Sequence, residues 1–97
     1  MQLTTLAEAK DFLSIDFDTK DREIEIRVNA IESYLFNGTG LKFETIPNDD
    51  SDDIYNLAKQ YVLTRLYFDY YPNENNEIIQ RNLTAQIKQL QALARTQ

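Results

Sequence analysis

Residues 55–71, YNLAKQYVLTRLYFDYY, carry six of the eleven aromatic residues of this chain. Placed at about 100° per residue, as in an α-helix, their apolar side chains cover most of the circumference. The polar side chains form one narrow stripe, Asn56, Gln60 and Thr64, which is flanked by Lys59. A helix of this kind lies at the centre of a bundle or forms half of an interface. A chain of 97 residues has little other surface with which to cover it.

Two charged residues interrupt the apolar part of this segment. Arg65 and Asp69 are four residues apart and lie on the side opposite the polar stripe. A single charge at that position is costly unless it is paired or reaches water. Together with the adjoining Tyr70 and Tyr71, they form our candidate subunit interface.

The length and composition indicate a single all-α domain spanning residues 1–97. A chain this short buries only about two-thirds of its unfolded surface and cannot support two cores. Hydrophobic residues make up 42% of the chain, and only two glycines and two prolines occur, which favours ordered helix over disorder. There is no apolar run of about eighteen residues and no signal-like start. We therefore expect a cytosolic site of synthesis and no membrane partner.

The chain contains no cysteine and no histidine. Zinc–thiolate sites, disulfide frameworks, cysteine nucleophiles and Ser-His-Asp triads are therefore excluded. Asp16, Asp18 and Asp21 resemble the start of a calcium loop, but Arg27 occupies the twelfth position, where a bidentate Glu is required. We predict no catalytic residue, no cofactor and no metal site, and hence no enzyme.

Four helical segments are predicted, and the first two are separated by a short connection. Thr5 and Glu8 form a capping box, so the first helix begins there and runs to about Leu13. After the connection of residues 14–19, Asp18 or Thr19 is expected to cap the second helix.

The second helix carries two apolar stripes and is expected to end at the glycine-containing residues 37–40. One stripe consists of Ile24, Val28, Ile31 and Leu35, and the other of Ile26, Ala30 and Tyr34. Two stripes predict two neighbours. The alternation of residues 23–28 also fits a β-strand, which is the alternative for this segment.

The third and fourth helices follow an acidic loop. The polar run of residues 48–53 places carboxylates at the positive end of the aromatic helix, which is expected to stop at Pro72 and Asn73. A last helix then starts near residue 75. Its apolar residues recur at steps of three and four: Ile79, Leu83, Ile87, Leu90 and Ala94.

The net charge of −6 is unevenly distributed along the chain. Residues 1–53 contain thirteen acidic and five basic residues, a net charge of −8, whereas residues 54–97 have a net charge of +2. An acidic half argues against tight binding of free duplex DNA. The division instead permits self-association in which the acidic half of one copy meets the basic half of the next.

Arg81, Lys88 and Arg95 recur every seven residues and form a basic stripe on the last helix. This stripe is a candidate surface for channel DNA or for an acidic partner. The alternative is a solvated helix face, in which Arg95 lies at the C-terminal end of the helix and interacts favourably with the helix dipole. We favour the solvated face.

A longer pattern of helix caps and apolar spacings extends from Leu6 to about Tyr71. Its residues, in order, are Leu6, Ala9, Lys10, Leu13, Ile15, Asp16, Asp18, Asp21, Ile24, Ala30, Tyr34, Leu35, Thr39, Gly40, Ala58, Val62, Leu63, Leu66 and Tyr67. This order resembles the small head-tail connector proteins of long-tailed bacteriophages and prophages, also called head-completion or adaptor proteins.

The resemblance implies a helical, four-helix-bundle-like subunit that assembles into a homo-oligomeric ring, commonly of twelve copies, beneath the portal protein of a filled head. DNA passes through the centre of such a ring, and the ring presents a surface to the next joining protein or to the tail. The implied location is the head-tail junction of the virion, after synthesis in the host cytoplasm. No catalytic site is implied.

Two other classes of protein remain as alternatives. A small acidic regulator or antitoxin-like interaction module would also be helical and lack catalytic residues, but it would hold one partner at a fixed low stoichiometry. A helix-turn-helix DNA binder needs a basic recognition helix. The basic stripe of Arg81, Lys88 and Arg95 has no glycine turn ahead of it, which argues against this class.

Overall fold

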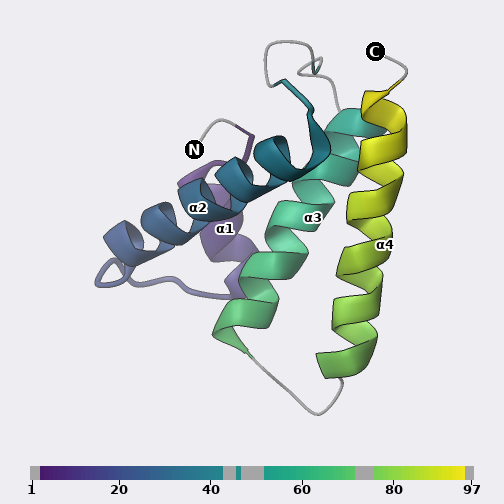
Figure 1. The fold of residues 1–97 in the computed structure, drawn as a ribbon. Coiled ribbons are helices and arrows are strands. Elements are labelled where there is room, and N and C mark those ends of the chain that lie inside the picture. The colour runs from purple at the N-terminus through teal and green to yellow at the C-terminus, as the bar shows by residue number, and fades with distance from the viewer. Residues whose placement is uncertain (1–2, 43–45, 47–51, 72–75, 96–97) are drawn as a thin grey trace.

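The computed structural model describes residues 3–42, 46, 52–71 and 76–95. They form four helices: α1 (Leu6–Leu13), α2 (Asp21–Thr39), α3 (Asp53–Tyr70) and α4 (Asn76–Ala94), shown in Figure 1. No strand occurs among these residues, which confirms the all-α prediction. The strand alternative for residues 23–28 is wrong, because these residues belong to α2. Ile26, which would share one face of a strand with Ile24 and Val28, is 57% exposed, whereas those two are fully buried.

The predicted start of α1 is confirmed in atomic detail. The Thr5 hydroxyl accepts a hydrogen bond from the Glu8 amide at 3.2 Å, and the Glu8 carboxylate accepts one from the Thr5 amide at 3.1 Å. The prediction for α2 is wrong, because neither Asp18 nor Thr19 caps it. The helix begins at Asp21 after Lys20, which makes no side-chain cap hydrogen bond. For Asp18 the reason is competition, since the Lys10 ammonium binds its carboxylate at 2.8 Å.

The end of α2 and the start of α3 agree with the sequence prediction. Gly40 follows α2 in the left-handed conformation, with φ of 79°, and its amide donates to the Phe36 carbonyl. Asp52 precedes α3, and its carboxylate accepts a hydrogen bond from the Tyr55 amide at 2.8 Å. The expected stop at residues 72–73 and the acidic residues 48–51 lie outside the described part of the chain.

Helices α2 and α3 share the centre of the molecule. Each packs against the other three helices, and α4 lies antiparallel beside α3 (Figure 1). The first predicted stripe of α2 is buried, whereas Tyr34 of the second stripe is 63% exposed. The fully or almost fully buried apolar side chains of α2, α3 and α4 are Ile24, Val28, Ile31, Leu35, Tyr55, Ala58, Tyr61, Val62, Leu66, Leu83 and Leu90.

The prediction that the aromatic helix is buried almost all round holds for its first part only. Tyr55, Tyr61 and Leu66 belong to the core, but Arg65 and Tyr67 are exposed. Tyr67 and Tyr71, at the end of this segment, are each 41% exposed.

A buried carboxylate fastens the segment that precedes α1. Glu32 of α2 is only 4% exposed, and its Oε2 atom accepts hydrogen bonds from the amides of Leu3 and Thr4, both at 2.9 Å. Charge-assisted hydrogen bonds of this kind compensate the loss of water around a buried carboxylate. The Leu3 side chain is buried in the same core.

Candidate interaction surfaces

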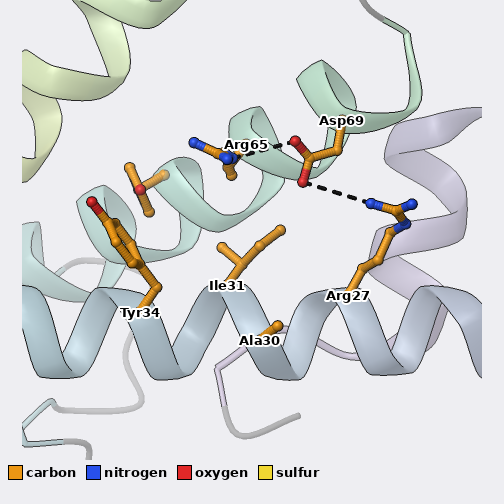
Figure 2. A pocket seen from close by; sticks show the side chains of 7 residues that line it. Arg27, Ala30, Ile31, Tyr34, Arg65 and Asp69 are labelled. Atoms are coloured by element: carbon orange, nitrogen blue, oxygen red, sulfur yellow. Dashed lines mark ion pairs between the residues drawn. The ribbon is translucent and has the colours of Figure 1, made fainter.

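A groove of about 300 Å³ opens between α2 and α3 (Figure 2). Its base is apolar, because Ile31 and Tyr61 are buried beneath it. The side chains of Arg27, Ile31 and Tyr34 project from α2 toward α3 in Figure 2. The complete lining is Arg27, Ala30, Ile31, Tyr34, Tyr61, Arg65 and Asp69.

One carboxylate and two guanidinium groups form the rim of this groove. Asp69 lies 3.3 Å from Arg65 Nε and 4.0 Å from a terminal nitrogen of Arg27. The Asp69 side chain is 22% exposed, whereas those of Arg65 and Arg27 are 44% and 45% exposed. Each guanidinium has five N–H donors, so both arginines retain donors that face solvent. The rim is therefore a site for an anionic group beside an apolar base.

A second groove of about 280 Å³ continues this surface toward α4. The two grooves share Tyr34, Tyr61 and Arg65, and Leu83 and Ile87 of α4 line the far side. Burial raises the pKa of the Tyr61 phenol, so its hydroxyl stays protonated as a donor near neutral pH. One face of the molecule thus carries a continuous hollow across α2, α3 and α4.

The structure divides the predicted interface residues between two environments. Arg65 and Asp69 lie on the groove rim, as described above. Tyr71 instead donates its hydroxyl to the main-chain carbonyl of Leu13 at 2.9 Å, within the same subunit. The Tyr70 ring faces the cationic groups of Arg27 and Lys20, 5.3 and 5.9 Å from its centroid. Burial, with Glu23 nearby, raises the pKa of Tyr70.

An aromatic cluster forms a second surface, between α1 and α3. Phe12 meets Tyr67 edge to face with ring centroids 5.8 Å apart, and Tyr67 lies 4.9 Å from the Tyr71 ring. All three rings are exposed by about two-fifths. A hollow of about 170 Å³ beside them reaches Phe68 and Ile79. This aromatic surface and the groove are formed by different residues.

The basic stripe of α4 is exposed along its length. Arg81, Lys88 and Arg95 all lie at the surface, and none forms an ion pair with another residue in the described part of the chain. None of the three lines the two grooves that share Arg65. The preferred interpretation as a solvated helix face stays a prediction, because exposure alone fits both readings of the stripe.

Sequence reasoning missed Arg27 and the loop residue Phe17. The sequence did contain a signal for Arg27. Arg27, Ala30 and Tyr34 follow at steps of three and four, and so they share one face of α2. Phe17 had no such signal. It is 48% exposed, in the connection between α1 and α2.

Across residues 3–42, 46, 52–71 and 76–95, no group of three carboxylates gathers as metal ligands would. No helix within those ranges combines the length and the hydropathy that crossing a bilayer requires. Comparison of the chain with protein-family models, curated proteins and solved structures finds no match. The function is therefore inferred from the surfaces described above.

Proposed function

We propose that this chain is the structural subunit of a head-tail connector ring in a long-tailed bacteriophage or prophage. The observation that carries the proposal is the presence of two different uncovered surfaces on one small subunit. One is the groove with Arg27, Arg65 and Asp69 on its rim. The other is the aromatic surface that contains Phe12 and Tyr67.

Two unlike surfaces favour head-to-tail association over a symmetric dimer. A two-fold dimer buries the same patch on both subunits, whereas a contact between different patches leaves one of each available to further copies. Such a contact closes into a ring when the rotation that relates neighbouring copies is a whole-number fraction of 360°, and otherwise it gives an open filament. The order of helix caps and apolar residues that resembles phage connectors supports the closed form.

The activity proposed for the ring is mechanical. It docks beneath the portal protein, extends the channel through which DNA passes without sequence-specific contacts, and offers a surface to a joining protein or the tail. The exposed stripe of Arg81, Lys88 and Arg95 is the candidate for contact with channel DNA or with an acidic partner. No chemical step is assigned to the subunit.

The size of the assembly tests this function. Sedimentation velocity over a wide concentration range, at low and high salt, is expected to show monomers when dilute and one large closed species when concentrated or when mixed with the portal protein of the same genome. Electron microscopy of that species should show rings. A complex of one subunit with one unrelated partner, and no ring under any of these conditions, would instead establish the regulator or antitoxin-like alternative.

The genes beside this one give a second, independent test. The proposal requires a capsid protein gene on one side and tail-joining genes on the other. A neighbouring toxin gene in place of these would contradict it.

A further inference from the structure

We propose that the groove between α2 and α3 receives the loop of residues 14–20 from a second copy of this chain, with Phe17 over the apolar base and Asp16 at the rim. The inference rests on the proposed self-association and assigns the groove an occupant, the loop, which is separate from the aromatic surface of Phe12 and Tyr67. The groove is the one lined by Ala30 and Tyr34. The loop connects α1 to the N-terminal end of α2 (Figure 1).

The loop is held in place by contacts on either side of Phe17. Before it, Ile15 is 9% exposed, and its amide donates to the Lys10 carbonyl at 2.9 Å. After it, the Lys10 ammonium binds both Asp18 at 2.8 Å and Asp21 at 2.9 Å. Phe17 is thus an exposed aromatic ring on an anchored loop. A fixed loop loses little conformational entropy when it binds, which favours association.

The groove offers the matching chemistry. Its base, formed by Ile31 and Tyr61 with Ala30 beside them, is apolar and suits an aromatic ring. A volume of about 300 Å³ is at the small end of the range for ligand sites, and is thus suited to one large side chain. Burial of an exposed aromatic side chain in such a site favours association, and aromatic residues are enriched in the cores of interfaces.

Charge complementarity favours a second copy as the occupant. Asp16 is exposed and makes no ion pair among the described residues. The guanidinium groups of Arg27 and Arg65 flank the apolar base and retain donors toward solvent. The rim carries these two guanidinium groups and the Asp69 carboxylate, a net charge of +1, so an apolar ring preceded by a carboxylate matches it.

The loop does not line the groove of its own subunit, so the contact joins different copies. Every copy carries both a loop and a groove. Where the loop and the groove of one copy contact two different neighbours, the contact is heterologous and repeats from subunit to subunit, as a ring requires; a reciprocal exchange between two copies would instead close a dimer.

Two single variants separate the two halves of the contact. Phe17→Ser removes the loop anchor and leaves the groove intact. Ala30→Glu puts a carboxylate into the groove and leaves the loop intact, and both Ala and Glu are good helix formers at this exposed position of α2. Each variant alone is expected to lose self-association by at least about tenfold in the association constant, measured by sedimentation.

Mixing the two variants is the decisive experiment. The loop of the Ala30→Glu copy can still enter the groove of the Phe17→Ser copy, so a one-to-one heterodimer is expected and nothing larger. With the Phe17→Ser copy labelled with nitrogen-15, amide shifts should be concentrated at residues around Ile31 and Tyr61. No heterodimer and no such shifts, or self-association of Phe17→Ser equal to that of the natural sequence, would overturn the inference.

Matched controls use the same chemical changes elsewhere. Ile78→Ser removes another large apolar side chain, which is 57% exposed, and Ala7→Glu adds a carboxylate at an exposed alanine of α1. Both are expected to leave the association constant unchanged.

The outcomes distinguish this contact from the ring itself. Closed rings of Phe17→Ser would contradict the loop contact and leave the connector proposal standing. A heterodimer of the two variants, together with open filaments or short oligomers of the natural sequence, would support the contact and contradict the ring.

Discussion

The Tyr71 hydroxyl donates a hydrogen bond to the main-chain carbonyl of Leu13 at 2.9 Å and so joins the end of α3 to the end of α1. The sequence had assigned Tyr71 to a contact between subunits. The structure gives it a role within the subunit, although its ring remains partly exposed beside Tyr67.

Tyr71→Phe is expected to reduce the free energy of unfolding by about 0.5 to 1.5 kcal/mol, the usual net value of one hydrogen bond. The ring contacts remain, so self-association should not change. Urea denaturation measures the first effect and sedimentation the second. A loss of association with unchanged stability would restore Tyr71 to the subunit interface.

Glu32→Gln is expected to lower the free energy of unfolding by about 1 to 3 kcal/mol, because two amides lose an ionised acceptor in a buried site. The same change should accelerate hydrogen exchange at the amides of Leu3 and Thr4, which bind this carboxylate. Glu25→Gln is the control, since Glu25 is exposed on the same helix. Equal effects of the two changes would contradict the role of Glu32 in fastening the N-terminal segment.

Gly38 and Gly40 are predicted to respond to alanine in opposite directions. Gly40 has φ of 79°, so Gly40→Ala should destabilise the fold by roughly 1 kcal/mol. Gly38 lies within α2 with open space around its Cα, so Gly38→Ala should stabilise by about 0.5 to 1 kcal/mol. Thermal unfolding of the two variants provides the comparison. A shift of both in the same direction would be inconsistent with the left-handed cap.

Stability is expected to fall at acid pH, in part through Glu8. Burial acts to raise the pKa of this carboxyl, but hydrogen bonds from Lys59 and Thr5 lower it below its usual value of 4.5. A carboxyl with a lowered pKa in the folded state stabilises the fold above its unfolded pKa, and this contribution is lost as pH falls through the folded value. Asp18 behaves likewise, because the hydrogen bond from Lys10 lowers its pKa.

Unfolding in urea between about pH 2 and pH 6 measures this dependence. Glu8→Gln should flatten the pH dependence of the free energy of unfolding below the ordinary pKa of Glu8, whereas Glu25→Gln, at an exposed residue of α2, is the control. An unchanged slope in Glu8→Gln would show that its pairing with Lys59 does not contribute to stability.

Asp69 is predicted to contribute modestly to stability, although it meets two arginines. Its pairs with Arg65 and Arg27 involve side chains that are almost half exposed, and one such pair contributes about 0.3 to 0.5 kcal/mol. Asp69→Ala should therefore destabilise by less than about 1 kcal/mol. A double-mutant cycle with Arg65→Ala isolates the pair. Unchanged melting and unchanged assembly in both single variants would remove any role for it.

Much of the secondary structure could be predicted because its signals are local. The capping box of Thr5 and Glu8, the glycine after α2 and the spacing of Leu83 and Leu90 each act within a few residues of chain. The cap of α2 was the exception. Lys10 sits in a different helix and competes for Asp18, so no local pattern reveals it.

The candidate site was found only in part, for a similar reason. Arg65 and Asp69 are one helical turn apart, and their pairing follows from spacing alone. The third member, Arg27, comes from another helix and reaches Asp69 only because α2 crosses α3. The groove itself depends on that crossing.

The sequence by itself determined the four helices, the absence of thiol and imidazole chemistry, and the division of charge between the halves of the chain. These follow from residue type, caps and a period of 3.6 residues. Only the tertiary structure decided which apolar face of α2 remained uncovered. Both apolar stripes of this helix are compatible with burial, but a short chain has enough other helices to cover only one of them. It also decided that Phe17 is presented on an anchored loop and that Tyr71 is bound within its own subunit. Each of these depends on contacts between helices that no local pattern specifies.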